Sequence, residues 1–267
     1  MTAFPALFIS HGAPNLALQD SPARDFFVGL GKELVDQGFG RPQAILIASA
    51  HFDMKLPSVS ADEKPGMLYD FKGFEEELYK EVYPAPGLPQ LATIAANLIE
   101  QSGFPAQELV GRGFDHGVWV PLKLIYPEAD IPVVQMAIQS DQGAGHHIAL
   151  GRALAPLRKH GVLIIGSGSL THNLDEVFKG GREFDAPVLD WVRDFDDWVL
   201  AKAEAGAIDE IADYRSLAPH ARENHPTEDH FLPLPFAFGA AGEGAKGRRI
   251  HHSVQWGVMA MDAYIFE

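Results

Sequence analysis

A short apolar run that ends in a histidine constrains this chain more than any other feature. The run covers Ala44 to Ala50, and His51 follows it directly. Its length, its two isoleucines and the preceding Pro42 favour a buried strand over a helix. A strand buried on both faces reads as continuous apolar sequence, as central parallel strands do. We therefore expect His51 beyond the carboxyl end of a parallel strand, where ligands bind in open α/β sheets.

The same arrangement occurs twice more. Residues 7–10 form an apolar run that leads into His11, and residues 162–165 lead through a glycine-rich turn into His172. Because the carboxyl ends of parallel strands meet at one edge of a sheet, the three imidazoles are expected near one another. Three converging imidazoles predict a metal site.

Apolar runs alternate with helix-like segments over the whole chain, which indicates an α/β fold. We expect a single domain over residues 1–267, with a central, mostly parallel sheet that is flanked by helices and carries the metal site at the carboxyl ends of its strands. Its length of 267 residues is ample for a sizeable core. The expected helices are 21–37, 73–83, 88–101, 145–159, 186–204 and 231–241. Pro156 is expected to end or kink the fourth of these, and Pro235 to kink the last. Further strands are expected at 56–60, at an edge of the sheet, at 131–138, and at 253–259 as the last strand.

Composition excludes several classes of function. The chain has 21 Lys and Arg against 36 Asp and Glu, a formal charge of −15, which argues against nucleic acid or an anionic membrane as a partner. It has no cysteine, so disulfides, thiolate metal sites and a cysteine nucleophile are impossible. No basic leader precedes the first apolar run, and no apolar stretch approaches the roughly 20 residues that span a bilayer. We expect a cytoplasmic protein; its oligomeric state stays open.

The chain has 12 histidines, and six of them lie in loops or at strand ends. Any one of these is more often a hydrogen-bonded structural histidine than a metal ligand. Together they favour a metal, because buried neutral imidazoles need partners for both nitrogens and one ion can serve several rings. Without cysteine a structural zinc site is disfavoured, and the residues alone leave catalytic zinc, copper and iron open. The six are His11, His51, His116, His172, His225 and His230.

Seven segments, in this order, together resemble the class III extradiol ring-cleavage dioxygenases, most closely the branch called 4,5-DOPA dioxygenase extradiol-like. One such segment would be weak support, but seven in the same order along nearly the whole chain are specific. They are Ser10–Asn15, Ser49–Phe52, Tyr69–Phe74, Tyr83–Gly87, Phe114–Trp119, Gly166–Asn173 and His225–His230.

The resemblance implies one divalent ion per chain, Fe(II) or Zn(II), held by His11, His51 and His230. In protocatechuate-cleaving members the third ligand is a glutamate; here the matching residue is His230, as in the DOPA-like branch. His172 matches the catalytic acid/base of the family and is also expected close enough to act as a fourth ligand. His225 matches a position that orients His230 or binds substrate.

The reaction implied is insertion of O2 into a catechol, DOPA-like or otherwise substituted, to give a muconic semialdehyde. His172 would move the protons, and His116 would hydrogen-bond the substrate or oxygen, with Asp115 fixing its tautomer. Gly166 and Gly168 would let backbone approach the metal pocket, or simply form a tight turn after a strand. An aromatic pocket is expected from Phe52, Tyr69, Phe71, Phe74, Trp119 and Phe231, unless these belong to the core.

Three alternatives use the same histidines differently. A zinc-dependent hydrolase or amidase would use the three imidazoles to activate water. A metal carrier without catalysis would lack an open coordination position. An α/β protein with structural histidines would bind no metal. Oxygen consumption with a catechol separates the dioxygenase from all three.

Overall fold

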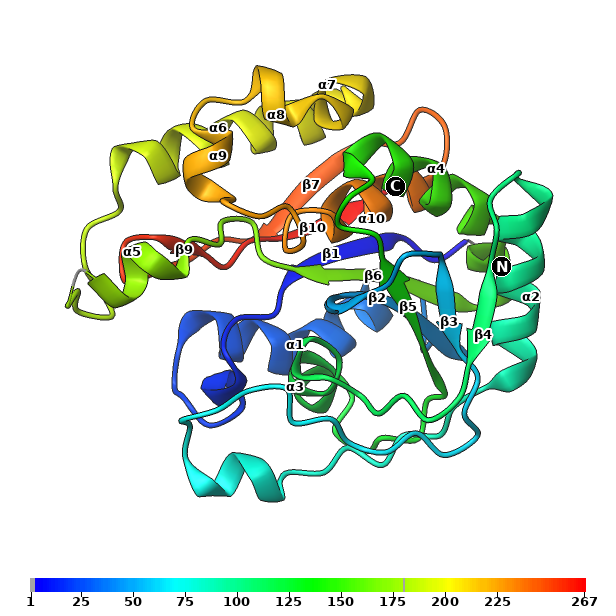
Figure 1. The fold of residues 1–267 in the computed structure, drawn as a ribbon. Coiled ribbons are helices and arrows are strands. Elements are labelled where there is room, and N and C mark those ends of the chain that lie inside the picture. Colours follow the sequence, from blue (N-terminus) through cyan, green and yellow to red (C-terminus); the bar gives the residue numbers. More distant parts are fainter. Residues whose placement is uncertain (1–2, 180) are drawn as a thin grey trace.

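The computed structural model describes residues 3–179 and 181–267. Within them, an eight-stranded sheet in the order β4-β3-β5-β2-β6-β1-β10-β7 forms the centre of the molecule (Figure 1). Two short strands, β8 (Val254–Gln255) and β9 (Met259–Ala260), pair separately. The strands of the main sheet are β1 (Ala6–Ser10), β2 (Ala44–Asp53), β3 (Ser58–Ser60), β4 (Gln107–Leu109), β5 (Val133–Ile138), β6 (Val162–Gly168), β7 (Gly247–His251) and β10 (Ala263–Phe266).

The four middle strands, β5, β2, β6 and β1, run parallel to one another. Strand β10 is antiparallel to β1, β7 is antiparallel to β10, and β3 joins β5 in the antiparallel sense. Strand β2 has a strand on each side and helices on both faces. Both of its faces are therefore buried, which explains its continuous apolar sequence. The expected α/β fold with a mostly parallel sheet flanked by helices is confirmed.

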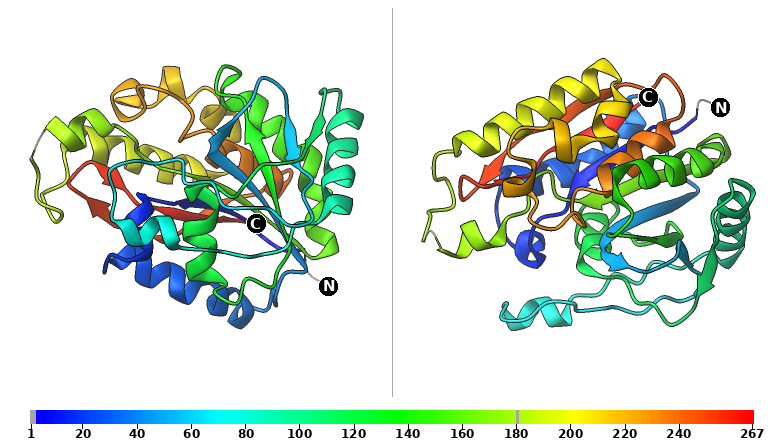
Figure 2. Two further views of the ribbon diagram at one scale, coloured as in Figure 1. Left: turned by 60° about the horizontal axis from the view of Figure 1, so that its bottom comes forward. Right: turned by 45° about the horizontal axis from the view of Figure 1, so that its top comes forward.

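Helices cover both faces of the sheet, as Figure 2 shows in two turned views. Alternate strand residues point to opposite faces, so Leu7 and Ile9 pack with α1 and α3, whereas Ala6 and Phe8 belong to the core on the other face. The first face carries α1 (Pro22–Asp36) and α3 (His116–Ile125); the second carries α2 (Pro89–Gln101), α4 (Gly143–Leu154), α6 (Asp190–Ala205) and α10 (Pro233–Ala241).

Short helical segments fill the connections. They are α5 (Leu174–Lys179), α7 (Ile208–Ala212), α8 (Tyr214–Leu217) and α9 (Ala221–Asn224), together with 3₁₀ turns at Pro14–Ala17, Glu76–Lys80 and Ala155–His160. No helix among the described residues is both long and apolar enough to cross a bilayer.

Local sequence signals explain where two of the helices begin and end. Ser21 caps α1, its hydroxyl accepting a hydrogen bond from the backbone N–H of Arg24 at 3.3 Å, and Pro22 opens the helix as expected. The expected early end near Pro156 is confirmed, because α4 stops at Leu154 and continues as a 3₁₀ turn.

Several expected elements were wrong. The helix over 73–83 is only the 3₁₀ turn Glu76–Lys80, and the strand near 56–60 is not at an edge, because β3 pairs with β4 as well as β5. The expected last strand over 253–259 is broken by a turn at Trp256 and Gly257, which both have positive φ. The last strand is instead β10, beside β1.

Pro235 does not kink the helix that contains it. Helix α10 begins at Pro233, so Pro235 lies in the first turn, where a backbone N–H would have no partner within the helix. The expectation of a kink was therefore wrong.

Candidate metal centre

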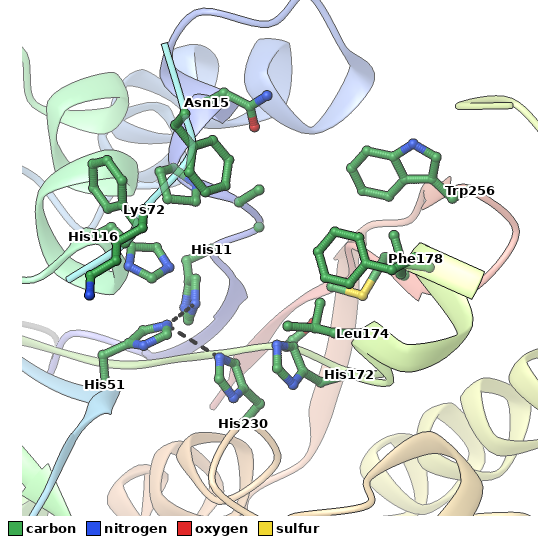
Figure 3. A pocket seen from close by; sticks show the side chains of 18 residues that line it. His11, Asn15, His51, Lys72, His116, His172, Leu174, Phe178, His230 and Trp256 are labelled. Atoms are coloured by element: carbon green, nitrogen blue, oxygen red, sulfur yellow. Dashed lines mark hydrogen bonds between the residues drawn. The ribbon is translucent and has the colours of Figure 1, made fainter. Parts of the chain in front are cut away.

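Three histidines from distant parts of the sequence meet beside the carboxyl ends of the central strands (Figure 3). His11 follows β1, His51 lies near the carboxyl end of β2, and His230 lies in the loop before α10. The Nε2 atom of His51 is 3.0 Å from that of His11 and 3.2 Å from that of His230. Two imidazole nitrogens that are each about 2.1 Å from one ion lie about 3.0–3.4 Å apart. The spacing is therefore that of donors to a common metal.

Each of the three rings has a polar partner at its other nitrogen. His11 donates from Nδ1 to the Ser167 hydroxyl at 3.0 Å, because that hydroxyl itself donates to a backbone carbonyl. His230 donates from Nδ1 to the Asp229 carboxylate. The Nδ1 atom of His51 lies 3.3 Å from Oδ2 of Asp70. These partners favour the Nδ1–H tautomer, which leaves the Nε2 lone pairs facing one another.

Burial keeps the three imidazoles neutral. It lowers the pKa of His11 and His230 well below the usual histidine value, and that of His51 to about 3, with neighbouring histidines adding to the effect. Metal ligation requires the neutral ring. In the Nδ1–H tautomer the three lone pairs that face one another have no donor between them, and a divalent cation would satisfy all three. Iron and zinc both accept such a set.

Two glycines of β6 create the space for the segment that carries His230. A Cβ atom on Gly166 would stand 2.0 Å from the carbonyl oxygen of Pro233, and one on Gly168 would stand 2.2 Å from that of His230. Both glycines lie inside β6, so the expectation of a tight turn was wrong. Their role is to let the backbone before α10 lie directly on the strand.

His116 lies beside the three converging histidines, but its partner differs from the one expected. Its Nδ1 is 2.9 Å from Oδ1 of Asp70, and its backbone N–H donates to the same oxygen at 3.1 Å. Asp115 instead accepts a hydrogen bond from Ser49 at 2.7 Å and pairs with Arg112 at 2.8 Å. The expectation that Asp115 fixes the tautomer of His116 was wrong, because the Asp115 side chain is directed toward β2.

His172 lies against the site without joining the three-nitrogen group. Its ring stacks on that of His230, with centroids 3.5 Å apart and planes within 5°. Burial lowers its pKa to about 4, which makes the ring neutral at pH 7. Its ring nitrogen groups with donor atoms of Asp229 and His230, rather than with those of His11 and His51.

His225 is buried behind the site. Its Nε2 donates to the carbonyl of Leu170 at 2.7 Å, and its ring packs against Phe195 and Phe231. Within the described part of the chain it does not belong to the cavity wall. It therefore ties the loop that leads to His230 onto the segment after β6.

A cavity of about 470 Å³ opens in front of the histidines. Of the six expected aromatic residues, Phe71 and Phe74 line it. Phe52, Trp119 and Phe231 are buried in the core, and Tyr69 packs against the core outside the lining. Sequence reasoning missed the opposite wall, which comes from α5 and the β8–β9 turn. A signal for it existed, because apolar residues at 174, 177 and 178 have helical spacing just after His172. That wall is formed by Leu174, Val177, Phe178, Trp256 and Met259.

A second group of titratable side chains lies outside the cavity wall. His252 is 3.1 Å from Asp262 and 3.4 Å from Asp196, and Arg249 lies 3.1 Å from both carboxylates. Burial, together with the charge of Asp262, raises the pKa of Asp196 to about 7. The arginine already supplies the cation that these acids need, so the group is an ion-pair network that joins α6 and β7 to Asp262, the residue before β10.

Comparisons with known proteins agree with this geometry. A family model described as "Catalytic LigB subunit of aromatic ring-opening dioxygenase" matches residues 5–266. A Beta vulgaris protein named "4,5-DOPA dioxygenase extradiol" is 42% identical over 261 residues, or 97% of this chain and 95% of its own length. A protein of the same name from Escherichia coli K12 is 37% identical and covers 90% of this chain and 86% of its own.

A solved structure shares the fold. The crystal structure of uncharacterized protein JW3007 from Escherichia coli K12 superposes with a TM-score of 0.78 at 31% sequence identity, covering 98% of this chain and 99% of that one. LigB dioxygenases are metal-dependent, and the described residues include histidine and aspartate groups able to hold an ion. Because the family match extends over almost every residue, the chain belongs to the LigB family and is a class III extradiol dioxygenase.

Proposed function

We propose that the chain acts as one catalytic domain over residues 1–267 that opens the ring of a substituted catechol, DOPA-like in character, with O2. The product is a muconic semialdehyde. The observation that carries the proposal is the convergence of three neutral Nε2 atoms, from His11, His51 and His230, on a cavity with largely apolar walls. The names of the relatives from Beta vulgaris and Escherichia coli support the choice of substrate class.

One divalent ion, Fe(II) or Zn(II), would be held by His11, His51 and His230. When bound, such an ion supplies a site for both catechol oxygens and a path for electrons between the ring and O2. The chain supplies the rest of the site. Phe71 and Phe74 on one side and Leu174 and Phe178 on the other form apolar walls suited to a flat aromatic ring.

Proton transfer falls to two histidines of the cavity wall. His172 is neutral at pH 7 and can accept a catechol proton, and the nearby carboxylate of Asp229 favours the cation that results. The same imidazolium can return the proton later in the reaction. His116 keeps Nδ1–H on Asp70, which leaves the lone pair of its Nε2 to accept a hydrogen bond from a substrate hydroxyl.

An oxygen electrode tests the proposed function. The purified chain is loaded anaerobically with Fe(II) or with Zn(II), and oxygen uptake is recorded with a series of substituted catechols. We expect uptake together with the visible absorbance of a ring-opened semialdehyde. His51→Ala serves as the control and should lose both the bound ion, measured by elemental analysis, and the uptake. Ester or amide hydrolysis by the zinc form, with no oxygen uptake from either form, would contradict the proposal and favour a hydrolase.

A further inference from the structure

The segment Tyr69–Phe74 provides two aromatic residues of the cavity wall, and it also carries Asp70, whose carboxylate contacts His51 and His116. Asp70 lies in the connection between β3 and the turn Glu76–Lys80, and its side chain is 18% exposed. Its Oδ2 is 3.3 Å from Nδ1 of His51, and its Oδ1 is 2.9 Å from Nδ1 of His116. One side chain therefore contacts a metal ligand through one oxygen and a substrate-facing histidine through the other.

We propose that Asp70 is a positioning residue that holds His51 and His116 together in the Nδ1–H tautomer, so that both present Nε2 to the cavity. The proposal rests on the metal site put forward above. Asp70 touches neither the ion nor the substrate in this arrangement, and it acts through the two rings.

The geometry of the two rings supports a shared partner. Their centroids are only 3.9 Å apart and their planes are inclined by 46°, so they lie side by side. The backbone N–H of His116 also donates to Oδ1 of Asp70, at 3.1 Å, which fixes the carboxylate at the start of α3. A carboxylate is the one side chain of this size that offers two acceptor oxygens and no donor. It accepts a hydrogen bond from His116 and offers its second oxygen, 3.3 Å away, to Nδ1–H of His51.

The other ligand histidines are supported one by one. Ser167 serves His11, and Asp229 serves His230. The tautomer of a histidine is set by the hydrogen bond of the nitrogen that does not bind metal. Asp70 differs from these two residues because it contacts both His51, a proposed ligand, and His116, which faces the substrate. We therefore expect a substitution of Asp70 to affect both histidines.

Substituting asparagine separates this role from a general effect of charge. Asparagine keeps one acceptor oxygen but replaces the other with an NH2 group that only donates. In Asp70→Asn the single oxygen can serve only one of the two rings. Either it faces His51 and His116 becomes the Nε2–H tautomer, or it stays on His116 and the NH2 group faces Nδ1–H of His51, which weakens metal binding. Asp229→Asn is the matched control, because it removes the same charge beside a ligand that needs only one acceptor.

The experiment uses the full chain loaded with zinc, which is diamagnetic, and reads histidine tautomers from long-range ¹H–¹⁵N NMR spectra. His51→Gln and His116→Gln variants assign the signals, and chelator competition measures zinc affinity. We expect Nδ1–H tautomers at both rings in the wild type. In Asp70→Asn we expect either an Nε2–H tautomer at His116 or weaker zinc binding than in Asp229→Asn. Asp70→Ala should bind zinc about 10–100-fold more weakly. Asp229→Asn should leave the tautomer of His116 unchanged.

The proposal is overturned if Asp70→Asn keeps the wild-type tautomer of His116 and also binds zinc as tightly as Asp229→Asn, or if Asp70→Ala binds zinc as tightly as the wild type. An Nε2–H tautomer at either ring in the wild type would also overturn the proposal. This measurement needs no variant, so the test does not depend on the folding of a variant. None of these measurements needs turnover. A protein that passes them but consumes no oxygen would remove the proposed function and leave the role of Asp70 in place.

Discussion

The ring of His172 stacks on that of His230. His172 is not one of the three proposed metal ligands, so its removal leaves all three in place. We expect His172→Ala to keep its metal and to lose turnover by about 10²–10⁴-fold, the usual contribution of a general acid or base. Elemental analysis and oxygen uptake on the same sample give the two values. Near-normal uptake in metal-loaded His172→Ala would remove the acid/base assignment, and loss of the metal would favour a ligand role.

At the scale of single residues, the sequence located the rings but not their partners. His11 and His51 were recognisable because each ends an apolar run, and His230 because of the motif around it. Asp70 was missed, since nothing in the spacing of the chain connects position 70 with 51 and 116. Asp115 was chosen because it is adjacent to His116, yet adjacent side chains leave the backbone in different directions.

At the scale of elements, the contact between β6 and the start of α10 decides where His230 lies. Gly166→Ala would place a methyl group 2.0 Å from the carbonyl oxygen of Pro233. We expect a loss of about 1–3 kcal/mol in the free energy of unfolding, as overpacking in a core usually costs, together with weaker metal binding. Urea denaturation and chelator competition measure the two effects.

A second glycine provides the comparison. Gly29 lies in α1, where an added Cβ meets nothing within 4 Å. Gly29→Ala should therefore stabilise the protein by about 0.5–1 kcal/mol through helix propensity alone. If both variants were stabilised equally, the close packing of the His230 segment on β6 would not be what holds it.

The parallel strands were predictable because each is a continuous apolar run with its own turn signals. Strand β10 was not predictable, because it is only four residues long. Its place between β1 and β7 also depends on pairing with β1, at the amino-terminal end of the chain. The helix expected over 73–83 failed for a related reason. Its acidic residues suit a helix start, but within the turn Glu76–Lys80 only Leu78 is buried, so little packing is available to extend the turn.

At the scale of the whole molecule, the number of buried histidines predicts sensitivity to acid. Burial lowers the pKa of His147 to about 4 and that of His225 to about 3. Below about pH 6.5 the unfolded chain binds protons at these rings that the folded chain does not. The free energy of unfolding should therefore fall as the pH drops from about 6.5 toward 4, by roughly 1.4 kcal/mol per pH unit for each such ring.

Urea denaturation of the metal-free protein at pH 7, 6 and 5 tests this expectation. Carboxylates also titrate toward the lower end of that range, so His147→Gln is the control that isolates one imidazole. Its stability should depend on pH less steeply than that of the wild type, by about 1.4 kcal/mol per unit. Equal slopes in the two proteins would show that His147 does not stay neutral in the folded state.

The wide separation of the three donors along the chain has a consequence for biosynthesis. His51 and His230 are 179 positions apart, so a growing polypeptide offers at most two of the three imidazoles until most of it has left the ribosome. An ion held by the proposed ligands would therefore be captured by a nearly finished fold and not by a fragment. Products of premature termination before residue 230 would carry only two of the three proposed ligands, so tight binding of the ion would report a chain that has been made almost to its end.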